Sequence, residues 1–131
     1  MCGCRRNVLL PVYRPAELER ALRAPLSAAL LKKDGYDAGE DLAAMLDRLS
    51  QRLRVKGDFP HEIGLFLGYP PEDVAGFQRH RGRNCKLCGH WKVYSDVERA
   101  KTMFRRYDQC REHLCARLAM GMTLGQVFQA A

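Results

Sequence analysis

The chain has 131 residues, of which 47% are hydrophobic and 28% are charged. This length suits one domain, and the composition is that of an ordinary folded protein, which excludes wholesale disorder. No apolar run approaches the roughly 18 residues of a transmembrane helix, and the N-terminus lacks the basic-then-apolar order of a signal peptide, so we expect a cytoplasmic protein without a membrane partner.

The charge is distributed unevenly along the chain. Residues 1–75 hold 11 Lys and Arg against 11 Asp and Glu, whereas residues 76–131 hold 11 against 4, so the whole net charge of +7 lies in the second part. We therefore expect one domain over residues 1–131 with a charge-balanced half and a basic half. A positive field favours thiolates and attracts phosphate groups and acidic proteins.

Proline and glycine separate short elements in the first third of the chain. The apolar segment 7–15 predicts a short strand. Proline is favoured at the first position of a helix and disrupts a helix interior, so Pro25 predicts two helices, over residues 15–24 and 26–33. Gly35 is expected to end the second helix, because glycine readily adopts a left-handed conformation.

The middle of the chain contains one regular amphipathic pattern and two shorter segments. Leucine and methionine recur at helical spacing over residues 39–56, which predicts a helix with one apolar face. Apolar side chains alternate over residues 60–68, which predicts a mostly buried strand. A proline followed by two acidic residues predicts a helix over residues 71–80.

The last part of the chain combines a strand with a long helix. A strand is predicted over residues 91–94, and residues 95–98 have the Ser-x-x-Glu pattern of a capping box. We expect the long helix over residues 96–119 and a short final helix over residues 124–129 that Thr123 caps. These elements predict a helix-rich α+β single domain with about three short strands.

Four cysteines of the basic half form two pairs. Cys85 and Cys88 are separated by two residues on a turn, and Cys110 and Cys115 are separated by four residues on the long helix. Two thiolates on a tight turn suit metal binding, and four suit tetrahedral zinc or an iron–sulfur cluster. We therefore predict a metal site formed by Cys85, Cys88, Cys110 and Cys115.

Helix geometry complicates this four-cysteine site. At about 100° per residue, Cys110 and Cys115 are about 140° apart around the helix axis. One metal could bind both only if the helix ended, kinked or unwound between them. His90 and His113 are further ligand candidates by spacing. Free cysteines also pack well as small apolar residues, and such packing is the structural alternative for these positions.

Two other functions stay open. A thiol-redox module would use Cys85 as nucleophile because Arg83 and Lys86 flank it, although the pair precedes a strand instead of opening a helix as in thioredoxins. A basic nucleic-acid-binding accessory would use Trp91 for stacking, although aromatic residues are sparse and a core role for Trp91 is favoured. No catalytic constellation is distinctive, so the sequence leans against an enzyme without excluding one.

Three segments of the chain resemble one protein family: "VLLPVYRPAELE", "FPHEIGLFLGYPPEDVAGF" and "NCKLCGHWKVYSDVERAKTMFRRYDQC". They are similar to an uncharacterised bacterial family, a domain of unknown function best known from anaerobic Firmicutes. The resemblance covers nearly the whole chain from Asn7 onward, and Arg14 and Pro15 match the "YRP" element of the family. The recurring cysteines of the family match Cys85, Cys88, Cys110 and Cys115.

The resemblance implies a biological context without an activity. The association of the family with iron and flavodoxin genes implies iron or redox metabolism and an acidic redox partner such as a flavodoxin. Family members carry a further segment before the "YRP" strand, so this chain is expected to lack a neighbouring strand that a homodimer would supply. An N-terminal cysteine of the family is expected to be missing here or to be replaced by Cys2 or Cys4, and His90 and His113 do not match its functional positions.

Overall fold

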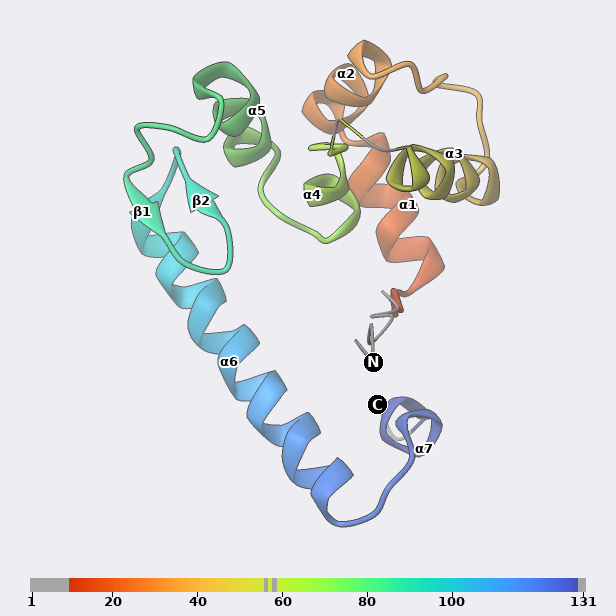
Figure 1. Ribbon diagram of the computed structural model, residues 1–131, viewed down its shortest axis with the longest axis vertical. Coiled ribbons are helices and arrows are strands. Elements are labelled where there is room, and N and C mark those ends of the chain that lie inside the picture. Colours follow the sequence, from red (N-terminus) through yellow and green to blue (C-terminus); the bar gives the residue numbers. More distant parts are fainter. Residues whose placement is uncertain (1–9, 56, 58, 130–131) are drawn as a thin grey trace, which may run out of the picture. The chain divides into compact units, whose positions relative to one another are not determined.

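The computed structural model describes residues 10–55, 57 and 59–129 (Figure 1). The chain divides into two compact units, Met1–Val74 and Ala75–Ala131, and this boundary lies within one residue of the boundary between the charge-balanced and basic parts. The described elements are seven helices and one two-stranded sheet, which confirms the helix-rich α+β class. That residues 1–131 form a single domain stays a prediction.

The helices of the first unit begin and end where proline, glycine and capping residues predict. Prolines open α1 (Pro15–Arg23) and α2 (Pro25–Lys33), and Gly35, with a φ of 89°, follows the end of α2. The backbone N–H of Tyr36 donates to the carbonyl oxygen of Leu31 (3.0 Å), which closes that end. Helix α3 (Leu42–Arg54) begins after Asp41, whose carboxylate accepts from the N–H of Ala44 (2.8 Å).

The strand predicted over residues 60–68 is wrong, because this segment contains the single helical turn α4 (Ile63–Phe66). The backbone N–H of Leu67 donates to the carbonyl oxygen of Ile63 (3.0 Å). Five apolar-rich residues are too few to distinguish alternation from one helical turn. Gly64 permits tight packing there, since a Cβ would lie 3.0 Å from the side chains of Tyr69 and Val74.

The strand predicted over residues 7–15 is also wrong within the described residues, because residues 10–14 form no strand and Pro15 already belongs to α1. Residues 7–9 lie outside the described residues. Leu10 and Val12 are 67% and 57% exposed, so their side chains do not pack into a sheet.

The other predicted helices are confirmed. They are α5 (Pro71–His80), within which the unit boundary falls, α6 (Val97–Ala119) and α7 (Leu124–Gln129). Thr123 caps α7 as predicted, because its hydroxyl accepts from the N–H of Gln126 (3.2 Å). None of the helices in the described part of the chain is both long and apolar enough to cross a membrane.

The first unit contains a buried carboxylate among its apolar core side chains. Glu62 is 1% exposed, and its Oε1 accepts from the Tyr36 hydroxyl (3.1 Å) and lies 2.7 Å from Nε of Arg52. Arg52 also donates to the carbonyl oxygen of Asp34 (2.7 Å). Burial, followed by the negative charge of Glu62, raises the pKa of Tyr36 far above its ordinary value. This network connects α3 to the segments on either side of it.

Replacing Glu62 should destabilise the first unit. Glu62→Ala is expected to lower the free energy of unfolding by about 2–3 kcal/mol, because Arg52 and Tyr36 lose their shared charged acceptor. Tyr36→Phe removes one hydrogen bond and should cost about 1 kcal/mol. Urea unfolding followed by circular dichroism measures both. Glu17→Ala, an exposed change on α1, is the control, and an equal loss there would contradict the importance of this network.

Tyr36 also predicts a loss of stability in alkali. Its pKa is higher in the folded chain than in the unfolded chain, so above about pH 10 the unfolded chain releases the proton first. The unfolded state then binds fewer protons, and stability falls as pH rises. In Tyr36→Phe the free energy of unfolding should fall less steeply with pH, by up to about 1.4 kcal/mol per pH unit. Urea midpoints measured from neutral pH into this alkaline range test it, and an unchanged slope would refute it.

Candidate metal centre

A small β-hairpin in the second unit carries Cys85 and Cys88. Strands β1 (Leu87–Cys88) and β2 (Lys92–Val93) pair antiparallel, with Leu87 opposite Val93 and Cys88 opposite Lys92. The strand predicted over residues 91–94 is thus confirmed at its centre. The N–H of Lys86 donates to the carbonyl oxygen of Val93 (2.8 Å), which extends the pairing toward Cys85. Both cysteines therefore belong to one ordered hairpin.

The apolar face of the hairpin packs against α6 within the same unit (Figure 1). Trp91 is 7% exposed and meets Phe104 edge-on, with ring centroids 4.6 Å apart, and it also contacts Tyr107. Val93 is fully buried. A Cβ on Gly89 would collide with the Phe104 ring, so glycine allows the hairpin tip to approach the helix this closely. Trp91 is thus a core residue, as favoured from the sequence.

The helix cap predicted at Ser95 lies one residue later, at Asp96. Helix α6 begins at Val97, and the carboxylate of Asp96 accepts from the N–H of Arg99 (2.9 Å). Aspartate and serine are equally good caps, and here Asp96 has the extended backbone that the cap position requires. The Ser95 carbonyl oxygen instead accepts from the amine of Lys86 (3.1 Å), which holds the two ends of the hairpin together.

The opposite face of the hairpin presents Cys88 together with Lys92 and Tyr94, and Cys85 lies just before β1. Cys88 is exposed, Cys85 is half-buried, and neither forms a disulfide. Partial burial, followed by the charges of Cys85 and Cys88, raises the pKa of Tyr94. The Tyr94 hydroxyl thus interacts electrostatically with both cysteines. The Tyr94 ring stacks on His80 at 5.4 Å, and its hydroxyl donates to the carbonyl oxygen of Arg83 (2.9 Å).

Sequence reasoning missed Tyr94 and His80 as neighbours of the pair. The alternation of a strand could have indicated Tyr94, because residues 88, 92 and 94 share one face when 88 pairs with 92. No local pattern could have indicated His80, since it lies at the end of α5 and reaches Tyr94 only through the tertiary fold.

The other two predicted ligands lie on α6. Cys110 and Cys115 are both exposed, and the helix continues without a break from Val97 to Ala119. Across residues 10–55, 57 and 59–129, no three His, Cys, Asp or Glu side chains are gathered in an arrangement that could hold a metal ion. Cys85 and Cys88 lie on one hairpin, and neither Cys110 nor Cys115 joins them in such an arrangement. The four-cysteine site stays a prediction.

The two histidines considered as ligands have different surroundings. Nε2 of His90 lies 3.1 Å from Asp108, whose carboxylate also binds Arg111 (3.0 Å). The His90 ring packs against Phe104 with centroids 5.3 Å apart. His90 therefore holds the hairpin tip to α6 through its ring and its nitrogen. His113 is exposed on α6.

Basic side chains surround the cysteine pair. The Lys92 amine donates to the carbonyl oxygen of Gly82 (2.7 Å) and lies 5.9 Å from the Phe77 ring centroid. Arg81 and Arg83 are exposed on the preceding loop, where Arg81 and Asn84 adopt left-handed conformations with φ of 50° and 57°. The hairpin and the loop before it thus carry positive charge that attracts anionic groups.

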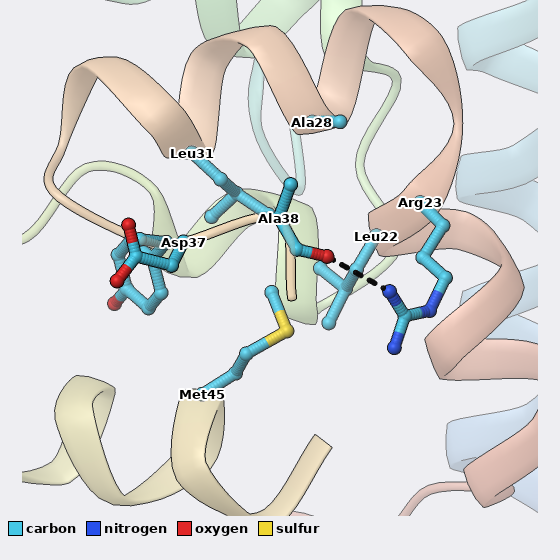
Figure 2. A pocket seen from close by; sticks show the side chains of 8 residues that line it. Leu22, Arg23, Ala28, Leu31, Asp37, Ala38 and Met45 are labelled. Atoms are coloured by element: carbon cyan, nitrogen blue, oxygen red, sulfur yellow. Dashed lines mark hydrogen bonds between the residues drawn. The ribbon is translucent and has the colours of Figure 1, made fainter. Parts of the chain in front are cut away.

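The first unit contains a separate hollow of about 170 Å³ (Figure 2). Its walls are mostly apolar, with Leu22, Leu31 and Met45 directed toward it. Arg23 at its rim donates to the carbonyl oxygen of Ala38 (3.2 Å) and to Glu19 (2.8 Å). The charged groups of this hollow thus stabilise the segment after α2. We propose no chemical role for the hollow.

The fold and the hairpin define a small helix-rich α+β protein, in which a two-stranded hairpin carries one half-buried and one exposed cysteine. The chain belongs to the family described as "Protein of unknown function (DUF3793)", which it matches over residues 1–128. No curated protein and no solved structure matches the chain. The resemblance to a family of unknown function is thus confirmed, and its bacterial, anaerobic association stays a prediction.

The close approach at Gly89 can be tested by substitution. Gly89→Ala is expected to cost about 1–3 kcal/mol, because the new methyl group collides with Phe104 and the hairpin must shift. Thermal unfolding followed by circular dichroism measures the loss. The double variant Gly89→Ala/Phe104→Leu should recover part of it. Gly125→Ala is the control, because a Cβ there would meet only the Thr123 hydroxyl oxygen, at an ordinary contact distance of 4.0 Å, and equal effects at both glycines would contradict the collision.

Proposed function

We propose that the protein binds a soft metal, zinc or the iron of an iron–sulfur cluster, through Cys85 and Cys88. The observation that carries this proposal is the place of Cys85 and Cys88 on a single hairpin, with the Cys88 side chain exposed to solvent. Thiolates a few ångströms apart are good ligands for such metals. The exposed face of Cys88 gives a metal access from solvent.

The rest of the hairpin supports metal binding through preorganisation. Trp91 and Gly89 fix the hairpin on α6, so the thiols are held in place before a metal arrives. Arg83 and Lys86 flank Cys85 and offset the negative charge that a metal–thiolate centre carries. Cys110 and Cys115 remain candidates for further ligands, and variants at these positions test them.

The biological context is part of the same proposal. We place the protein in the iron or redox metabolism of an anaerobe, in the cytoplasm, with an acidic redox protein such as a flavodoxin as partner. The concentration of positive charge in residues 76–131 supports an acidic partner, because complementary charge steers association.

The first test is the metal content and visible absorption of protein purified without oxygen. The wild type should carry metal; colourless protein with zinc indicates a zinc site, and brown protein with iron and sulfide indicates a cluster. Cys85→Ser and Cys88→Ser should each lose the metal, because two ligands disappear as a chelating unit. Circular dichroism checks that both variants fold.

Protein that binds no metal after purification and after titration with zinc would refute the proposal. A disulfide between Cys85 and Cys88 on mild oxidation would then favour the thiol-redox module. Binding to RNA or DNA that weakens steeply with salt would favour the nucleic-acid accessory.

A further inference from the structure

We infer that two copies of the chain share one metal, each contributing Cys85 and Cys88 to a site with four thiolates. This inference rests on the proposed metal-binding function and adds the second copy as partner. The hairpin pair would be half of the site, so that metal binding and dimerisation are one event.

The first argument is the number of ligands. Zinc in structural sites is bound by four ligands, commonly cysteines, and an iron–sulfur cluster as a whole is commonly held by four cysteines. Among the residues that the structure describes, the pair gains no third His, Cys, Asp or Glu. Because Cys88 is exposed, a metal bound there would direct its remaining coordination positions toward solvent. A second hairpin can approach from that side.

The second argument is the cost of using the cysteines of α6 instead. Cys110 and Cys115 lie about 140° apart around the axis and about 7.5 Å apart along it. Gathering them with the pair would require unwinding α6 or lifting the hairpin from it. Lifting the hairpin exposes Trp91, which is 7% exposed in its contact with Phe104, at a cost of about 3 kcal/mol.

The third argument is electrostatic. Zinc with four thiolates carries a net charge of about −2 once the thiols have released their protons to solvent. The segment around the pair carries exposed basic side chains, namely Arg79, Arg81, Arg83 and Lys86. Two such segments repel each other without metal and are attracted to a dianionic centre between them. The interface is therefore expected to form only when metal is bound.

A shared site also fits two-fold symmetry. Identical chains most often pair through the same surface on both copies. Two hairpins related by such an axis would supply two pairs of thiolates to a metal on the axis, which is the tetrahedral set that zinc prefers. A second copy of the same chain would therefore complete the site, and no different partner protein is needed.

The test is a zinc titration of reduced, metal-free full-length protein, followed by analytical ultracentrifugation. We expect monomer without metal, and dimer formation that is complete at one zinc per two chains. A chelator should return the wild type to monomer, which excludes an intermolecular disulfide. Cys88→Ser replaces an exposed side chain and should keep the wild-type circular dichroism spectrum. It should nevertheless lose both zinc and dimer.

Two double variants serve as matched controls. Cys110→Ser/Cys115→Ser and Cys2→Ser/Cys4→Ser should each keep zinc and dimer. One zinc per chain on a monomer, lost in either double variant, would overturn the shared site while the proposed metal binding stands. One zinc per chain on a monomer in the wild type and in both double variants would also overturn it. Absence of zinc binding by the wild type would overturn both the shared site and the proposed metal binding.

Discussion

The position of the cysteine pair depends on the contact between Trp91 and α6. A two-stranded hairpin is at best marginally stable by itself in water, and here each strand has only two residues. The edge of Trp91 against Phe104 and the lack of a side chain at Gly89 let the hairpin lie directly on the long helix. The burial that stabilises the hairpin thus also holds in place the segment that carries the thiols.

Much of the helical structure could be predicted from the sequence, because its boundaries depend on local chemistry. Proline at a first helical position, glycine after a helix and the Thr123 cap act within a few residues. The turn α4 could not be predicted, since so short an apolar segment fits one helical turn as well as the alternation of a strand. Nor could the buried position of Glu62, because its partner Tyr36 is 26 residues away in the chain and charged residues are rarely buried.

The candidate site likewise has one part that the sequence predicts and another that only the fold reveals. Spacing alone identifies Cys85 and Cys88 as a pair, and helix periodicity correctly places Cys110 and Cys115 on an unbroken helix that separates them. The surroundings of the pair required the tertiary fold: Tyr94 lies beside it and His80 stacks on Tyr94 from another helix. Sequence patterns therefore specify which groups are chemically able to bind a metal, and packing decides which of them meet.

Trp91 is the sole tryptophan of the chain, and this gives the protein an internal optical reporter. Its indole lies in the hairpin that carries the thiols, three residues after Cys88 and shielded from water by Phe104. Zinc has a filled d shell and does not absorb visible light, so emission from Trp91 would survive zinc binding. A coloured iron–sulfur cluster at the same thiols would quench that emission by energy transfer, so the emission would reveal the metal without any added label.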